Sequence, residues 1–245
     1  MTLSNSVTEA AGNVRVAAVQ MVSTPRVDEN LETAARLIAE AVARGAMLVA
    51  LPEYFPIMGL KDSDKFKVRE ANGDGHLQTF LAETARQYGI WLVGGSIPLV
   101  ASEEGKVLNS CLVFDPQGER VARYDKIHLF GFQKGKERYD ERASIEAGHQ
   151  AVAFNTPFAR VGLSICYDLR FPELYRALGV TDLQVIPAAF TETTGHAHWE
   201  IMLRARAIEN QCYVLAAAQG GKHENGRETH GNSMLIDPWG VVIDD

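Results

Sequence analysis

Short apolar runs alternate with segments whose apolar positions recur at helical spacing, and this alternation is the main structural signal in the chain. VRVAAVQ at 14–20 and MLVALP at 47–52 are runs typical of strands that are buried on both faces. Between them, apolar side chains from Leu31 to Val42 recur every three or four residues, and Gly45 follows. This spacing predicts a helix that ends at the glycine, so the first unit is strand, helix, strand.

The rest of the chain repeats these signals. We predict a second helix over 77–88 and a strand over 90–97, followed by an antiparallel hairpin in which VLNSCLVFD and ERVARYDK flank a proline–glycine turn. The second half predicts, in order, a hairpin over 151–166, a helix from Pro172, a strand over 183–190, a helix over 197–211, a strand at YVLAAAQ and a final hairpin in SMLIDPWGVVIDD. We therefore expect one α/β domain over 13–245, with mixed sheets inside and helices outside.

The two ends of the chain are predicted separately. Residues 1–12, MTLSNSVTEAAG, lack the basic and apolar regions of a secretion signal, and we expect a disordered tail. The chain stops directly after the final predicted hairpin turn. We therefore expect the C-terminal segment to be truncated.

Charge and cysteine content narrow the class of protein. The net charge is −7 at pH 7, which argues against binding to nucleic acid or to an anionic membrane. The three cysteines, Cys111, Cys166 and Cys212, are odd in number and show no CxxC spacing. This favours reduced thiols in a cytoplasmic protein over a disulfide framework or a zinc site. Cys111 and Cys212 lie within apolar segments and are predicted to be core residues.

Three reactive side chains occur where predicted strands end: Glu53, Lys126 and Cys166. Ligands of α/β proteins bind beyond the carboxyl ends of strands, so these ends can meet at one pocket. Taken singly, each residue has a simpler interpretation as a solvated charge or a core thiol. Together they are a base, an electrophile and a nucleophile, because Glu53 could take the thiol proton and Lys126 could stabilise negative charge. The backbone N–H of Tyr167 is a second candidate donor to an oxyanion.

LPEYFP, YDKIHLFG and GLSICYDLRFPELYR resemble the three signature segments of the nitrilase superfamily, the carbon–nitrogen hydrolases. The resemblance implies a catalytic triad of Glu53, Lys126 and Cys166 and an α-β-β-α sandwich. It also implies a second glutamate at Glu141, which orients the lysine and assists the base. Such enzymes use no cofactor and no metal, and the resemblance implies a homodimer or higher homo-oligomer.

The segment 189–223, with HGNSMLIDPWG after it, is similar to the deaminated-glutathione amidase branch of that superfamily. This implies hydrolysis of a small carboxamide to a carboxylate and ammonia, and the preferred substrate is deaminated glutathione, hydrolysed to α-ketoglutarate and cysteinylglycine. The sister branch of ω-amidases, acting on α-ketoglutaramate, is the alternative. A catalytically silent binding protein of the same fold is a third hypothesis, although its expected sign is a broken triad.

Several polar residues outside the triad have two interpretations each. Lys222 and Arg227, in the predicted loop 220–231, are expected to meet the distant carboxylate of deaminated glutathione, and the alternative is a solvated loop. Asp168 and Arg170 are predicted to form a structural ion pair. The histidines that a metal site or a papain-like pair with Cys166 would need are His196, His198, His223 and His230. A metal site lacks a third ligand at a recognised spacing, and a papain-like pair leaves Glu53 unexplained. Whether these histidines contact substrate stays an open question.

Overall fold

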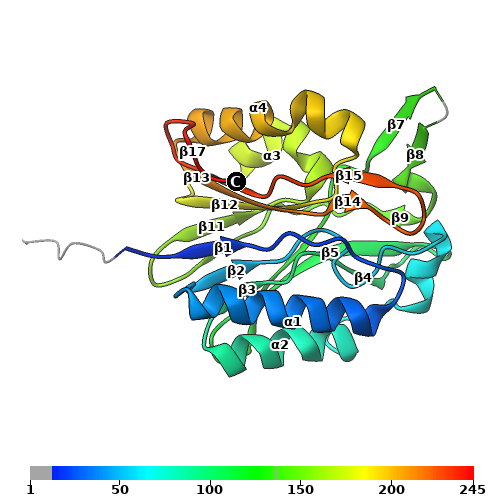
Figure 1. Cartoon of the computed structure of the whole chain (residues 1–245), viewed down its shortest axis with the longest axis horizontal. Coiled ribbons are helices and arrows are strands. Elements are labelled where there is room, and N and C mark those ends of the chain that lie inside the picture. Colours follow the sequence, from blue (N-terminus) through cyan, green and yellow to red (C-terminus); the bar gives the residue numbers. More distant parts are fainter. Residues whose placement is uncertain (1–12, 136) are drawn as a thin grey trace, which may run out of the picture.

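The computed structural model describes residues 13–135 and 137–245, and it arranges them as helices, sheet, sheet and helices in successive layers (Figure 1). This is the α-β-β-α sandwich that the motifs implied. The predicted N-terminal tail, residues 1–12, lies outside the described residues. No helix within the described residues is long and apolar enough to cross a membrane.

The first sheet contains seven of the strands that precede residue 147. Its order is β1-β2-β3-β5-β4, and β6 and β9 also pair with β5. β1, β2 and β3 run parallel, whereas β3, β4 and β6 are antiparallel to β5. The strands are β1 Val16–Ala18, β2 Leu48–Ala50, β3 Trp91–Val93, β4 Ile97–Val100, β5 Val107–Phe114, β6 Arg120–Asp125 and β9 Ile145–Glu146.

The second sheet contains later strands in the order β10-β11-β12-β13-β16-β17. Its centre, β11-β12-β13, is parallel, and its outer pairs are antiparallel. The strands are β10 Ala153–Asn155, β11 Arg160–Leu163, β12 Leu183–Ala188, β13 Tyr213–Ala218, β16 Met234–Ile236 and β17 Val242–Asp244. Both sheets are mixed, as the sequence predicted.

Helices cover the outer face of each sheet (Figure 1). α1 Val27–Ala43 and α2 His76–Tyr88 lie over the first sheet, and α3 Pro172–Ala177 and α4 Glu192–Asn210 lie over the second. Short 3₁₀ helices form at Asp62–Lys67, Glu141–Ala143 and Cys166–Arg170. α4 begins five residues before the predicted position, because the Thr191 side chain caps it by accepting a hydrogen bond from the Thr194 N–H at 3.2 Å.

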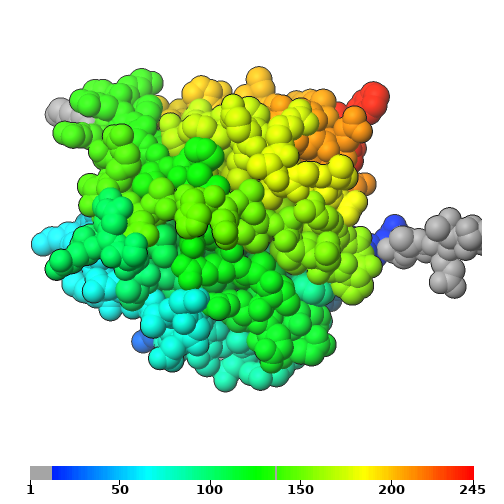
Figure 2. Space-filling model, turned by 180° about the vertical axis from the view of Figure 1, so that it is seen from behind, coloured from blue at the N-terminus to red at the C-terminus, as the bar shows by residue number. Residues whose placement is uncertain are grey.

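Two hairpins of short polar strands were not predicted from the sequence. β7 Gly131–Lys134 pairs with β8 Glu137–Asp140, and β14 Gly220–Lys222 pairs with β15 Glu228–His230. The β7–β8 hairpin stands out at one corner of the molecule, as the space-filling view shows (Figure 2). The β14–β15 hairpin replaces the loop predicted over 220–231.

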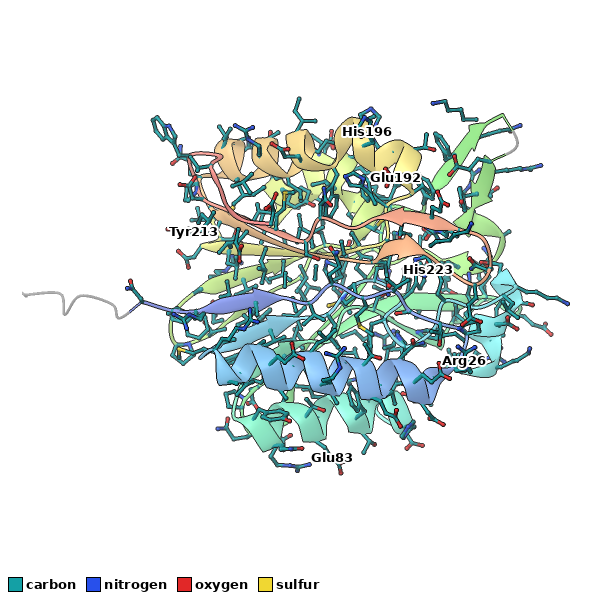
Figure 3. The ribbon with its side chains drawn as sticks, in the orientation of Figure 1. Arg26, Glu83, Glu192, His196, Tyr213 and His223 are labelled. Atoms are coloured by element: carbon teal, nitrogen blue, oxygen red, sulfur yellow. The ribbon has the colours of Figure 1, made fainter. Side chains whose placement is uncertain are left out.

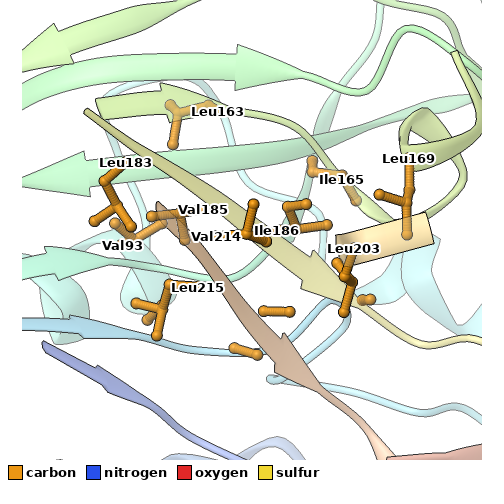
Figure 4. Packing of buried hydrophobic residues seen from close by; sticks show 14 of the residues in the cluster. Val93, Leu163, Ile165, Leu169, Leu183, Val185, Ile186, Leu203, Val214 and Leu215 are labelled. Carbon is orange, nitrogen blue, oxygen red and sulfur yellow. The ribbon is translucent and has the colours of Figure 1, made fainter. Parts of the chain in front are cut away.

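The apolar residues divide into two clusters, one on each face of the first sheet. Leu48, Ala50 and Val93 face the second sheet, whereas Val49 and Leu92 face α1 and α2. The inner cluster continues through the second sheet to α3 and α4 (Figure 4). This alternation explains why the central strands are continuous apolar runs. The polar site residues are the exceptions to it.

Candidate active site

Glu53 lies three residues beyond β2 and is held by contacts from both sheets. Its side chain is 1% exposed. The side chain of Gln219, directly after β13, donates a hydrogen bond to the Glu53 carbonyl at 3.1 Å. Gly95 packs closely against Pro52, the residue before Glu53. A Cβ at position 95 would lie 2.2 Å from the Pro52 carbonyl oxygen. The backbone that carries Glu53 is therefore held by contacts that do not involve its side chain.

Lys126 follows β6, and its ammonium group is fully buried between two carboxylates. Nζ lies 2.9 Å from Glu53 Oε1 and 3.0 and 2.8 Å from the two oxygens of Glu141. Burial works to lower the pKa of the ammonium, but Glu141 and Glu53 together raise it above its usual value. Lys126 is therefore charged at neutral pH.

The carboxylate of Glu141 is saturated with hydrogen-bond donors. Besides Lys126, the Tyr54 hydroxyl donates to Oε1 at 2.7 Å, and the Phe130 N–H donates to Oε2 at 2.7 Å. Burial raises the pKa of this carboxyl, but the Lys126 charge and hydrogen bonds outweigh burial and hold the pKa below its usual value. A carboxylate held by four contacts is suited to anchoring Lys126, not to moving protons.

In Glu53 one carboxylate oxygen accepts hydrogen bonds from the described residues, whereas in Glu141 both oxygens do. Oε1 accepts hydrogen bonds from Lys126 Nζ and from Asn109 Nδ2, the latter at 3.0 Å. Within the described part of the chain no hydrogen bond to Oε2 is found. Glu53 therefore has a free oxygen with which it can accept a proton.

Cys166 begins a sharp turn beyond β11 and has a left-handed backbone conformation, with φ of 50°. The turn is tied by the fully buried carboxylate of Asp168, which accepts hydrogen bonds from the Ile165 N–H at 2.8 Å and the Tyr124 hydroxyl at 2.7 Å. A left-handed conformation costs energy in a residue with a Cβ and is maintained only when its surroundings impose it. These contacts hold the thiol in one place.

The predicted ion pair between Asp168 and Arg170 is wrong. Asp168 points inward and pairs with His128, whose N–H and Nδ1 lie 3.0 and 2.7 Å from Oδ1. Arg170 points the other way, over the Tyr167 ring at 5.7 Å. The two residues are two positions apart on a tight 3₁₀ turn, so their side chains point to different sides of the turn.

The Cys166 thiol is protonated at rest. Burial and the neighbouring Glu53 carboxylate raise its pKa well above the usual value, although Lys126 and a hydrogen bond from the Ala189 backbone lower it. At neutral pH a base must therefore remove the proton as the sulfur attacks. Glu53 is the carboxylate with a free oxygen for that task.

Two hollows lie near these residues. A crevice of about 10 Å³ borders the sulfur and is lined by Phe130, Cys166, Tyr167, Arg170, Ala189, Phe190, Thr191 and Thr194. A cavity of about 580 Å³ has Tyr54, Asn109, Glu141 and Arg227 among its lining residues. Phe130 lines both hollows, whereas Cys166 is a lining residue of the crevice.

The residues predicted to bind substrate are separated by the structure. Tyr167 lines the crevice and Arg227 lines the cavity, where its guanidinium stacks on Tyr139 at 5.0 Å and donates to the Ala189 carbonyl at 2.9 Å. The Arg227 Nε is buried and has no partner within the described residues. Lys222 is exposed on β14 and is not among the described residues that line the cavity.

The four histidines do not gather at one place. His196 points outward from α4, and His223 lies buried at the β14–β15 hairpin (Figure 3). His198 contacts Arg170, and His230 pairs with Glu192. Among residues 13–135 and 137–245, no group of three or more His, Cys, Asp or Glu side chains is arranged to hold a metal ion.

Sequence reasoning missed Asn109 and Tyr54, which complete the hydrogen bonding of Glu53 and Glu141. A signal for Asn109 exists, because VLNSCLVF places an amide in an otherwise apolar strand. Tyr54 directly follows Glu53, but nothing local shows that its hydroxyl reaches a residue 87 positions away.

Comparison with known proteins gives consistent results. The family model described as carbon–nitrogen hydrolase matches residues 15–245. The deaminated glutathione amidase of Synechocystis sp. is 44% identical over 235 residues, covering 94% of this chain and 86% of that protein. The omega-amidase NIT2 of Xenopus tropicalis is 39% identical over 233 residues, covering 94% and 83%. The solved structure of Saccharomyces cerevisiae Nit3, a nitrilase superfamily member, is 29% identical, with a TM-score of 0.82 over 94% of this chain and 84% of that chain.

Proposed function

This chain belongs to the carbon–nitrogen hydrolase family and is a hydrolase acting on amides, and we propose that it works through Cys166 as nucleophile, Glu53 as general base and Lys126 as oxyanion donor. One observation carries the proposal. A fully buried ammonium is held between two carboxylates, beside the buried thiol of Cys166. Burying three charges beside a thiol carries a desolvation cost, and such costly clusters of perturbed groups are concentrated at functional sites.

The first half-reaction forms a thioester. Glu53 Oε2 takes the thiol proton while the sulfur bonds to the amide carbon and the carbonyl electron pair moves onto oxygen. The Lys126 ammonium and the Tyr167 N–H stabilise that oxyanion. The carbonyl then re-forms, the C–N bond breaks, and Glu53 returns its proton to the departing nitrogen. The amine released is ammonia from a primary amide, and cysteinylglycine from deaminated glutathione.

The second half-reaction hydrolyses the thioester. Glu53 takes a proton from water as the water oxygen attacks the thioester carbon. When the tetrahedral intermediate collapses, the C–S bond breaks and the proton returns to sulfur. The carboxylic acid product leaves, and Glu53 and Cys166 are restored to their starting protonation states, so the cycle needs no cofactor.

We propose deaminated glutathione as the preferred substrate. A relative named deaminated glutathione amidase is 44% identical over nearly the whole chain. The cavity holds Arg227, whose buried Nε has no partner among the described residues, and a guanidinium there suits the terminal carboxylate of a long substrate. The alternative, α-ketoglutaramate, is favoured by a relative named omega-amidase at 39% identity.

The test is kcat/KM for both substrates on one preparation of the protein. A ratio above about tenfold in favour of deaminated glutathione, equivalent to about 1.4 kcal/mol, supports the first substrate. The reverse ratio assigns the chain to ω-amidase activity. Release of neither ammonia nor cysteinylglycine would support the catalytically silent binding protein and overturn the amidase proposal.

We further propose a cytoplasmic homodimer that binds neither nucleic acid nor membrane. The three cysteines are free and buried, which suits a reducing compartment. The net charge of −7 disfavours both polyanionic partners. Ile201 on α4 and Trp239 beside β17 are 69% and 86% exposed, and apolar side chains of this size suit a protein interface. Light scattering at two protein concentrations tests the dimer, and a monomer mass at both would overturn it.

A further inference from the structure

Asn109 is a buried amide on the inner face of β5. Its neighbours on that face, Cys111 and Val113, belong to the apolar cluster between the sheets, and Asn109 is 2% exposed. Its carbonyl oxygen accepts the Lys126 N–H at 2.9 Å, so the strand pairing itself brings Asn109 beside the lysine. An amide in this row is unexpected, because the positions around it favour apolar side chains.

The hydrogen bonding of the Asn109 side chain is one-sided. Nδ2 donates to Glu53 Oε1 at 3.0 Å, and a carboxylate can only accept, so the orientation of the amide is unambiguous. Oδ1 is buried and has no partner in the described part of the chain. A buried unpaired oxygen lowers stability, and an apolar residue of the same size would remove that cost. The amide is therefore poorly suited to a purely structural role.

The Lys126 ammonium alone cannot orient Glu53. A carboxylate rotates about its last bond, and one ammonium bound to one oxygen does not fix the plane of the group. A second donor on a different element restrains that plane. Asn109 from β5 and Lys126 after β6 both bind Oε1, which leaves Oε2 as the oxygen without a donor.

We propose that Asn109 is a positioning residue that holds Glu53 so that Oε2 faces Cys166 throughout the proton transfers. The inference rests on the proposed function, since it concerns the base of that reaction. In the neutral form of Glu53 the proton sits on Oε2, because Oε1 is occupied by two donors. The same oxygen can then return the proton to the departing nitrogen without rotation of the carboxyl group.

The experiment replaces the amide by an apolar side chain of similar size. Asn109→Leu keeps the volume and removes both the donor and the unpaired oxygen. We expect kcat to fall about 10- to 100-fold and by a larger factor than any rise in KM, because Asn109 also lines the cavity but acts on the reaction through the base. Thermal unfolding should show a midpoint close to that of the wild type, because removal of the unpaired oxygen offsets the loss of one hydrogen bond to Glu53. If N109L does not fold, Asn109→Ala is measured in its place.

The control variant is Ser110→Ala, one residue along β5. Ser110 is also fully buried and donates to a carboxylate, but that carboxylate is Asp125, which does not belong to the site. We expect kcat of S110A to stay within about twofold of the wild type. A similar loss in both variants would mean that damage to β5, and not the orientation of Glu53, lowers activity.

A double-mutant cycle with Glu53→Gln completes the test. Because Asn109 acts through Glu53, N109L in the E53Q background should cost less than about threefold in kcat. If the kcat losses of N109L and E53Q multiply in the double variant, or if N109L keeps the wild-type kcat, the role of Asn109 is overturned. Either result leaves the amidase proposal intact. A wild-type protein that hydrolyses neither deaminated glutathione nor α-ketoglutaramate would overturn both.

Discussion

Lys126 Nζ lies 2.9 Å from Glu53 Oε1, although 73 residues separate the two in the chain. The two side chains are 0% and 1% exposed, so water cannot replace either partner. A buried charge that loses its partner costs far more than an exposed one. Substitutions in this group should therefore affect activity and stability in separable ways.

Cys166→Ala should reduce turnover by about 10⁴-fold or more. Cysteine and alanine both carry a Cβ, so the left-handed backbone at position 166 is equally strained in the wild type and in C166A. The thermal midpoint should therefore change little. Mass spectrometry of the wild type with substrate should trap an acyl group on Cys166. The control is Cys111→Ala, which removes a fully buried thiol from the core. Undiminished turnover in C166A would exclude the thioester mechanism.

Lys126→Arg keeps the charge but replaces a compact ammonium with a planar guanidinium. The space between Glu53 and Glu141 is closed, so we expect kcat to fall about 10²–10³-fold, the usual effect of losing an oxyanion donor. Lys126→Met should in addition destabilise the fold by about 3–5 kcal/mol, because it leaves two buried carboxylates without their cation. Urea unfolding measures this difference.

The control for Lys126 is Lys67→Arg. Lys67 also pairs with a carboxylate, Asp64, but its side chain is 75% exposed. Its kcat and stability should match the wild type. If K126R lowers kcat by less than about threefold, Lys126 has a structural role and is not the oxyanion donor.

Arg227→Gln should raise KM for deaminated glutathione several-fold, about 1–2 kcal/mol for lost charged hydrogen bonds, with little change for α-ketoglutaramate. Lys222→Gln is the matched control from the same hairpin, because Lys222 is exposed. We expect R227Q to account for nearly all of the effect of neutralising both residues. Equal losses on the two substrates would mean that Arg227 supports the site through the Ala189 carbonyl and Tyr139.

Stability should depend on pH through His223. Burial lowers the pKa of its imidazole in the folded protein. A hydrogen bond to the Ser23 carbonyl raises this pKa, but the Arg227 charge lowers it further, and the net shift is downward. Just below about pH 6.5 the unfolded chain therefore binds more protons than the folded one. The contribution of His223 is complete above that pH and is lost as the pH falls through it.

Thermal midpoints at about pH 7.5 and about pH 5.5 measure this contribution. The wild type should lose more stability on acidification than His223→Gln, which cannot gain a proton. The control is His196→Gln, whose exposed imidazole on α4 should leave the pH dependence unchanged. Parallel pH profiles for wild type and H223Q would rule out this histidine as the source.

The predicted elements with a strong apolar pattern are those that the structure contains. α1, α2 and the central strands of both sheets were predicted from periodicity, because burial of an apolar face is determined mainly by the local order of residues. β7–β8 and β14–β15 were missed because short polar strands carry no such pattern. The strand predicted over 90–97 is divided into β3 and β4 by the turn at Gly95, which has a φ of 56°.

By itself, the sequence determined which side chains stand at the strand ends, since Glu53, Lys126 and Cys166 each follow a recognisable strand. It did not determine how they divide the work. Only the packed sheets decide that Glu141 is saturated while Glu53 keeps one free oxygen, and that Asp168 turns inward to His128 and away from Arg170. Apolar pattern acts over neighbouring residues, whereas a hydrogen bond between residues 56 or 87 positions apart exists only once strand pairing in the first sheet has brought those distant segments together.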